Sequence, residues 1–430
     1  MSWPACTGVV ISNMIGTGIF TTTGLMLGVL DSGWMVLLCW LVGGMIAIAG
    51  ALSYAELATM MPRAGGEYIY LREIYGPLPA FLSGWTSFFV GFSAPVAASA
   101  VAFATYLGAA GLLPQSWAAQ KAASVGVILL LTGIHYTGLR FGSRVQSALT
   151  ALNLVLLLGL IALGFSSERA DFSFLAAGSG FWAAGKWSQM ATPLLWVMFA
   201  YSGWNAAAYL GEEVEQPART LPRSLLLGTA TVIVLYLLLN LFLFAAAPQE
   251  KLRDVVAVAE IAVQQLFGSS AGRWLAIAVS LALVSAISAF MMIGPRVYYA
   301  MARDGLFFPF AGRIHPRFET PSFSIVAQGV CASLIALTGT FGQLLTYIGF
   351  ALGIFPWLTV LGVLLLRSRR PAEPRPYRVW AYPLLPLFYL TLMTWVMSVS
   401  FVHNLKPSLI AIATVAAGAP AYFLVGRKRP

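Results

Sequence analysis

Long apolar stretches separated by short polar connections dominate the chain. A membrane-spanning helix needs about 20 consecutive apolar residues, and about twelve segments of that kind follow one another with turn residues between them. The predicted spans are residues 3–28, 33–60, 78–108, 119–137, 145–165, 190–211, 223–247, 272–302, 322–340, 343–366, 380–400 and 406–426. The connections at 28–33 and 340–343 are so short that they predict antiparallel helical hairpins.

Two of these segments carry glycine and polar residues near their centres. The first reads SNMIGTGIF over residues 12–20, and the sixth reads WVMFAYSGWNAAAYLGEE over residues 196–213. An unwound helix leaves N–H and C=O groups unpaired, at several kcal/mol each in hydrocarbon. Such a break therefore persists only where it lines a cavity. The alternative is that Gly16 and Gly18 simply allow close helix packing.

The spacing of the two breaks indicates an inverted repeat. Five segments separate them, so the sixth helix crosses the membrane in the opposite sense to the first. Two five-helix units that each begin with a broken helix are typical of a secondary transporter. We therefore divide the chain into a first repeat over 1–165, a second repeat over 166–370, and a final helix pair over 371–430.

The peptide groups freed at the breaks match an α-amino acid zwitterion. The N–H groups of Thr17 and Gly18 begin a half-helix, at the positive end of its dipole, and favour a carboxylate. The carbonyls of Met14, Phe199 and Ser202 lie at the C-terminal ends of half-helices and favour an ammonium group. One cavity that presents both kinds of group predicts an amino acid as the substrate.

Composition and charge agree with a membrane protein. Of the 430 residues, 59% are hydrophobic and 9% charged, against about 25% charged in a soluble domain. Membrane lipid is therefore the main solvent. If the N-terminus is cytoplasmic, eighteen of the 25 Lys and Arg residues fall in the cytoplasmic connections and tail. This obeys the positive-inside rule and predicts a multi-pass protein of the plasma (inner) membrane with both termini cytoplasmic. The net charge of +10 needs no nucleic-acid partner.

Residues that carry enzymatic or metal chemistry are not grouped in the sequence. The cysteines Cys6, Cys39 and Cys331 lie inside apolar segments, and the three histidines are far apart, so we expect no disulfide and no metal site. The chain has no P-loop and no nucleophile constellation, and we expect neither an enzyme nor a cofactor. Almost no ionisable residue falls deep in a segment, which favours substrates whose charges cancel.

Several motifs together resemble the amino acid–polyamine–organocation (APC) transporters, and in particular the L-type amino acid transporters and their bacterial relatives. These motifs are MIGTGIF, SYAELATMMPRAGGEYIYLREIYGPLPAF, FAYSGWN, EEVEQPARTLPRSL and GPRVYYAMARDGLFF. The resemblance runs from the first segment through the tenth. It implies an all-α membrane protein with a LeuT-like fold, a 5+5 inverted repeat and about twelve transmembrane helices, of which helices 1 and 6 are broken.

The resemblance also implies which residues bind the substrate. Phe199 would form an aromatic gate between the site and the exterior, Phe290 would wall the side-chain pocket, and Asn13 would line the site. Asn205 stands where the arginine/agmatine antiporters have a glutamate, which agrees with a neutral substrate. The full set is Asn13, Met14, Gly16, Thr17, Gly18, Phe199, Ser202, Gly203, Asn205 and Phe290.

One position departs from the family pattern. Where many members have a lysine in the fifth helix, this chain has Asn153, which excludes proton coupling through that lysine. Two alternatives stay open. Asn153 bridges helices as a neutral hydrogen-bonding group, or a sodium ion enters, held by carbonyls of the first helix and the hydroxyls of Ser285 and Ser288. Serines in helices bond their own backbone more often than they bind ions.

These inferences lead to a secondary active transporter for neutral L-amino acids that works by alternating access, as an exchanger or an ion-coupled symporter. The alternatives are a transporter for cationic amino acids or polyamines, and an amino acid sensor of the same fold. Eukaryotic L-type relatives join an accessory chain through a cysteine between the third and fourth helices. Residues 109–121 contain none, so we expect no disulfide-linked accessory subunit.

Overall fold

A computed structural model describes the chain except residues 64, 139–141, 177–185, 304, 306 and 427–430. Every regular element within this part of the chain is a helix. Arg140 and the basic tail over 427–429, which contribute to the topology prediction, lie outside the described residues.

Each of the twelve predicted segments contains a helix, which confirms the helical membrane architecture. Eight helices in the described residues are long and apolar enough to cross a membrane, and the bent pair α1 and α2 makes up to nine. The helices that fall on the predicted segments are α1 (Trp3–Met14), α2 (Thr17–Leu30), α3 (Gly33–Met60), α5 (Pro77–Thr86) continuing through a π-helical stretch (Ser87–Ser93) into α6 (Ala94–Ala109), α7 (Trp117–Tyr136), α8 (Gly142–Ser166), α10 (Ala191–Ala200), α11 (Pro217–Ala246), α14 (Ser269–Arg303), α15 (Ser322–Thr338), α16 (Phe341–Arg369), α17 (Leu384–His403) and α18 (Leu405–Gly426).

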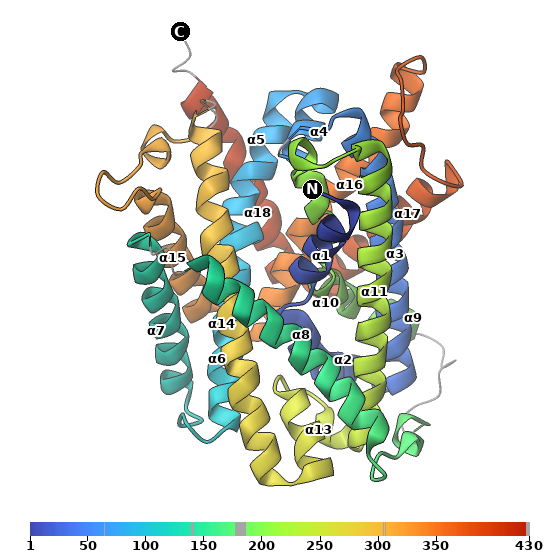
Figure 1. Cartoon of the computed structure of the whole chain (residues 1–430), viewed down its shortest axis with the longest axis vertical. Coiled ribbons are helices and arrows are strands. Elements are labelled where there is room, and N and C mark those ends of the chain that lie inside the picture. Colours follow the sequence, from blue (N-terminus) through green and yellow to red (C-terminus); the bar gives the residue numbers. More distant parts are fainter. Residues whose placement is uncertain (64, 139–141, 177–185, 304, 306, 427–430) are drawn as a thin grey trace.

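Shorter helices occupy several of the predicted connections. They are α4 (Glu67–Tyr75), a 3₁₀ turn (Phe172–Ala176), α9 (Lys186–Gln189), α12 (Gln249–Leu252), α13 (Val258–Phe267) and a 3₁₀ turn (Pro309–Gly312). The N-terminus and the last turns of α18 lie toward the same end of the molecule, the end that α4 also occupies (Figure 1).

Both predicted helix breaks are present. The axes of α1 and α2 differ by 44° across residues 15–16. In the sixth segment α10 ends at Ala200, and the chain continues through turns into two short 3₁₀ helices, Ala206–Tyr209 and Gly211–Glu213. The predicted span over 190–211 is therefore wrong in its second half, which contains no α-helix. Gly203 takes a φ of +101°, and this left-handed conformation turns the chain away from the helical path.

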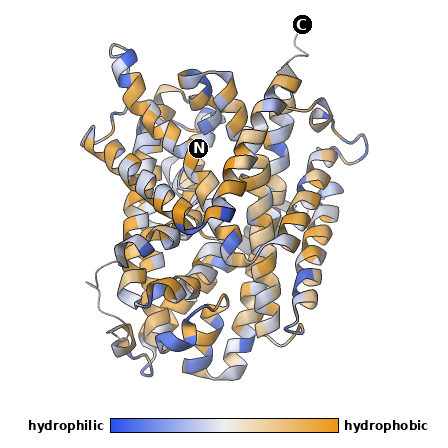
Figure 2. Cartoon of the chain, turned by 180° about the vertical axis from the view of Figure 1, so that it is seen from behind, coloured by the Kyte–Doolittle hydropathy of each residue, from blue (hydrophilic) through white to orange (hydrophobic). Residues whose placement is uncertain are grey.

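The two broken helices occupy the middle of the bundle. α1 packs against α11, which in turn packs against α3, while α10 contacts α2, α3, α16 and α17. Hydrophobic residues cover most of the helix lengths, and hydrophilic residues gather mainly in the connections (Figure 2). Large apolar side chains on the outer helices, including Leu130, Val155 and Leu334, are more than half exposed. A lipid surround accounts for this exposure, since such side chains are usually buried in water-soluble proteins.

A buried ion pair joins α3 to α16. The Glu56 side chain is 1% exposed, and its two oxygens accept hydrogen bonds from Nε of Arg367 at 2.9 Å and from a terminal guanidinium nitrogen of Arg367 at 2.6 Å. The backbone N–H of Val379 donates a third bond at 2.8 Å. A paired guanidinium and a backbone donor together offset much of the cost of burying the carboxylate.

We expect Glu56→Gln to lower the stability of the folded protein by about 3 kcal/mol, because it leaves the Arg367 guanidinium without its counter-charge. Thermal unfolding of the purified protein in detergent measures this. Glu73→Gln is the matched control, because Glu73 pairs with Arg370 at 3.0 Å on the surface, where such pairs contribute about 0–1 kcal/mol. Equal melting temperatures for the two variants would contradict the conclusion that the buried Glu56–Arg367 pair stabilises the fold.

Candidate functional site

The two helix breaks touch each other. A Cβ atom added at Gly203 would lie 2.8 Å from the carbonyl oxygen of Asn13, closer than real Cβ atoms come. The positive φ of Gly203 and this close approach both require glycine. The irregular segment after α10 therefore lies directly against the end of α1.

One tyrosine hydroxyl joins the ends of the two half-helices. Tyr236, in the middle of α11, donates a hydrogen bond to the carbonyl of Met14 at 2.6 Å, and the same hydroxyl lies 3.3 Å from the carbonyl of Ala200. Its ring stacks on that of Tyr201 with centroids 5.2 Å apart, and Trp40 packs edge-on against both rings. Tyr236 thus satisfies part of the hydrogen-bonding demand that the breaks create. It is absent from the set derived from the sequence.

A small cavity of about 80 Å³ lies at the break between α1 and α2. No side-chain hydrogen bond caps the N-terminus of α2 at Gly16, so the positive end of this half-helix is open to an anion from the cavity. The cavity brings together the predicted residues Asn13, Met14, Gly16, Thr17, Gly18, Asn153, Phe199, Ser202, Ser285 and Phe290.

The three ion-coupling candidates do not converge on one point. The Asn153 amide donates to the carbonyl of Ala282 in α14 at 3.4 Å, and Ser285 lines the small cavity. Ser288 is not among the lining residues, because its hydroxyl lies 3.0 Å from Nε2 of His135 in α7. The structure therefore places Ser288 away from the site that the sequence analysis assigned to it.

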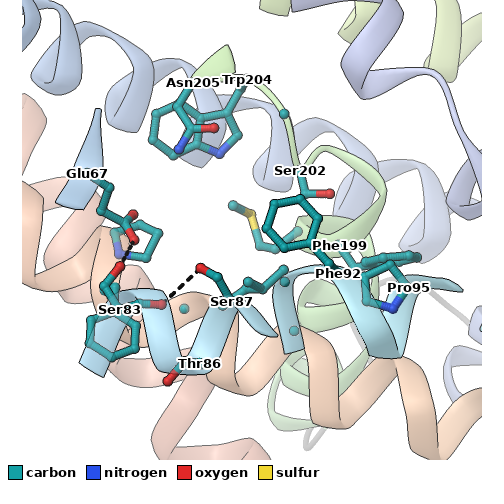
Figure 3. Close-up of a pocket in the computed structure, with 18 of the residues that line it drawn as sticks. Glu67, Ser83, Thr86, Ser87, Phe92, Pro95, Phe199, Ser202, Trp204 and Asn205 are labelled. Atoms are coloured by element: carbon teal, nitrogen blue, oxygen red, sulfur yellow. Dashed lines mark hydrogen bonds between the residues drawn. The ribbon is translucent and has the colours of Figure 1, made fainter. Parts of the chain in front are cut away.

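A second and larger cavity, of about 220 Å³, adjoins the first. Three of the predicted residues line both cavities, namely Phe199, Ser202 and Phe290. Two others, Gly203 and Asn205, line only the larger cavity. Figure 3 shows Phe199 and Ser202 on one side of this cavity, with Glu67 and Ser83 across from them. The two phenylalanines thus lie where one cavity meets the other.

The larger cavity also holds an ionisable group that the sequence analysis did not assign to the site. Glu67, the first residue of α4, has a side chain that is largely buried. It accepts hydrogen bonds from the hydroxyls of Tyr54 at 2.6 Å and Ser83 at 2.9 Å. The larger cavity therefore contains an ionisable group, whereas none of the described residues that line the small cavity at the breaks is ionisable. The sequence does not predict this position, because Glu67 falls in the polar connection over 61–76. Only the folded packing of α4 places it at the cavity.

Burial raises the pKa of the Glu67 carboxyl above its ordinary value, while the hydrogen bonds from Tyr54 and Ser83 oppose that shift. Desolvation is the largest of these influences, because the charged form loses water that the two hydroxyls replace only in part. Glu67 therefore binds a proton at a higher pH than an exposed glutamate does.

Comparison with known proteins agrees with this geometry. The family model described as "Amino acid permease" matches residues 1–419. The chain belongs to this family. The permease is 30% identical to the Asc-type amino acid transporter 1 of Mus musculus, over 98% of this chain and 79% of that protein. It is 30% identical to the human large neutral amino acids transporter small subunit 2, with the same coverage of 98% and 79%. It is 28% identical to the serine/threonine exchanger SteT of Bacillus subtilis (strain 168), over 98% of this chain and 95% of that protein. These are membrane transporters, and the permease is a transporter rather than an enzyme.

The two glycines of the first break have different surroundings in this permease. A Cβ atom at Gly18 would lie 2.5 Å from Cβ of Ala200, whereas a Cβ atom at Gly16 would meet no atom within 4 Å. Close packing of α2 on α10 therefore requires Gly18. Gly16 faces open space at the small cavity, so a side chain there would occupy the room that a ligand needs.

This difference predicts opposite behaviour for two substitutions. Gly16→Val should keep the melting temperature of the parent and lose the rise in melting temperature that a bound amino acid causes. Gly18→Val should lower the melting temperature itself, by an overpacking cost of about 1–3 kcal/mol. Thermal unfolding with and without L-leucine, L-serine and L-alanine measures both effects. A full ligand response in Gly16→Val, or an unchanged melting temperature in Gly18→Val, would contradict the prediction.

Proposed function

We propose that the permease is a secondary active transporter that moves neutral L-amino acids across the plasma membrane by alternating access. The observation that carries the proposal is the meeting of two broken helices at one cavity. Residues at the uncapped N-terminus of α2 and at the C-terminal ends of α1 and α10 line this cavity together. Opposite partial charges at one site suit a small solute that has both a carboxylate and an ammonium group.

The backbone would hold both ends of the substrate. The N–H groups of Thr17 and Gly18 would receive the carboxylate, and the carbonyls of Met14, Phe199 and Ser202 would receive the ammonium group. Tyr236 already donates to the Met14 carbonyl. A carbonyl oxygen has two lone pairs, so the Met14 oxygen can accept a bond from the substrate as well.

Neutral substrates are favoured by the surroundings of the breaks and by the relatives. Asn205 contributes an amide, not a carboxylate, beside the second break. The relatives are named for Asc-type and large neutral amino acid transport and for serine/threonine exchange. In this proposal Phe199 is the gate between the two cavities, and Phe290 bounds the space for the substrate side chain.

Coupling would involve Asn153 as a neutral bridge from α8 to α14, without a cofactor. Its hydrogen bond to the Ala282 carbonyl supports that alternative. The sodium alternative is weakened, because Ser288 faces His135, so that only Ser285 of the two serines proposed to hold sodium lines the small cavity. We therefore expect exchange without a requirement for sodium.

The orientation follows from the basic residues. We propose that both termini are cytoplasmic, because eighteen of the 25 Lys and Arg residues fall on that side of the predicted topology. We also propose that the permease functions without a disulfide-linked accessory subunit, since residues 109–121 contain no cysteine.

Counterflow in proteoliposomes tests the function. Vesicles loaded with unlabelled L-leucine or L-serine should accumulate the same labelled amino acid, with or without gradients of sodium and pH. Excess unlabelled leucine should inhibit this uptake more strongly than excess arginine. Failure to move any of a full panel of amino acids would overturn the proposal, and a thermal response to amino acids without flux would instead indicate a sensor. Stronger inhibition by arginine would indicate a transporter for cationic substrates.

A further inference from the structure

The Glu67 end of the larger cavity contains a buried carboxyl group with unused acceptor positions. The Glu67 side chain is 8% exposed and lines the cavity. Each of its oxygens accepts one hydrogen bond, from Tyr54 or from Ser83, whereas a carboxylate has about four lone-pair positions. Figure 3 shows the carboxyl group beside Ser83 at the edge of the cavity, across from Phe199 and Ser202.

No cation of the described chain neutralises this group. Three tyrosines are close enough to interact with its charge: Tyr54 of α3, Tyr209 of the 3₁₀ helix Ala206–Tyr209, and Tyr389 of α17. α5, which packs against α4, contributes the Ser83 hydroxyl and has no charged residue. Among the residues that the structure describes, no Lys, Arg or His forms an ion pair with Glu67.

The arginines at the end of α16 and on α4 are either paired with other carboxylates or exposed. α16 also packs against α4, but its Arg367 pairs with Glu56, and its Arg369 is exposed. Arg370, which follows α16, pairs with Glu73. Arg72, on α4 itself, is exposed. The position of Glu67 in the first turn of α4 gives some support to the ionised form.

A buried carboxylate without a counter-ion costs several kcal/mol, and a cation that enters the cavity and pairs with Glu67 would offset that cost. An ammonium group supplies three donors, enough to use the unfilled acceptor positions. We propose that Glu67 makes this end of the larger cavity a binding site for an organic ammonium group. Where the permease moves amino acids, as proposed above, this site holds the amino group of a substrate on its way to or from the helix breaks.

A proton competes with the ammonium group for Glu67. Because burial raises the pKa of this carboxyl, protonation begins at a higher pH than for an exposed glutamate. The ionised form, which binds the amine, dominates above this raised pKa, so the affinity for an amine falls as the pH decreases through it. An alkylamine itself stays cationic throughout, since its pKa is near that of lysine, about 10.4.

Binding of isobutylamine, which has an ammonium group and no carboxylate, tests the site directly. Isothermal titration of the purified full chain in detergent, from pH 5 to pH 8, gives the dissociation constant. We expect Glu67→Gln to weaken binding at pH 8 by tenfold or more, because it removes the charge and keeps the shape. Glu73→Gln, which changes an exposed carboxylate on the same helix, should bind like the parent.

Tyr54→Phe provides a second measurement that retains the carboxyl group. It removes one donor from the carboxylate, so the pH at which amine binding is half lost should move upward. Parent-like binding in Glu67→Gln, or no binding by the parent protein, would overturn the proposal. The outcome is independent of transport. Amino acid counterflow without amine binding would reject this site alone, and amine binding without counterflow would reject the transport function alone.

Discussion

The unpaired peptide groups at the two helix breaks are the constraint on which the rest of the structure depends. In hydrocarbon each such group costs several kcal/mol, and the protein meets this demand with a few contacts. The Tyr236 hydroxyl lies against carbonyls from both breaks, and Gly203 brings the second break onto the backbone of the first. The other peptide groups at the breaks are separated by the sign of their partial charge. N–H groups lie at the start of α2, and carbonyl groups lie at the ends of α1 and α10.

Because both breaks face one region, the two adjoining cavities can act as a single path. Phe199, Ser202 and Phe290 form the boundary between them. A rotation of either phenylalanine ring would therefore change the connection between the backbone site and the end at which Glu67 lies. The packing of α10 against α2, α3, α16 and α17 means that a movement of α10 would reach several helices of the bundle together. This suits a mechanism in which one group of helices rocks against another around a central site.

Much of the fold follows from local patterns in the sequence. The apolar segments predict the helices because spanning length and hydropathy are properties of contiguous residues, and the glycines of residues 16–18 and 203 mark where helices end. The second half of the sixth segment is different. Its residues 206–208 are alanines, good helix formers, yet they adopt only a 3₁₀ turn, because the preceding break directs the chain out of the helical path.

Residues whose role depends on distant contacts could not be predicted in the same way. Tyr236 interrupts an aliphatic run, which hints at a polar partner, but the sequence does not say that this partner is a carbonyl more than 200 positions away. Glu67 lies in a short polar connection, and only the packing of α4 brings it to the cavity. Ser288 and Ser285 lie almost one turn apart on α14, and small differences in helix rotation decide which one reaches the site.

The most direct test of the account is an experimental density map of the permease with L-leucine bound. The account predicts interrupted helices at residues 14–17 and 200–205. It also predicts density for the amino acid between them, with the carboxylate at the N–H groups of Thr17 and Gly18 and the ammonium group at the carbonyls of Met14, Phe199 and Ser202. Continuous α-helix through both regions, or an amino acid bound elsewhere with these peptide groups paired to protein, would contradict it.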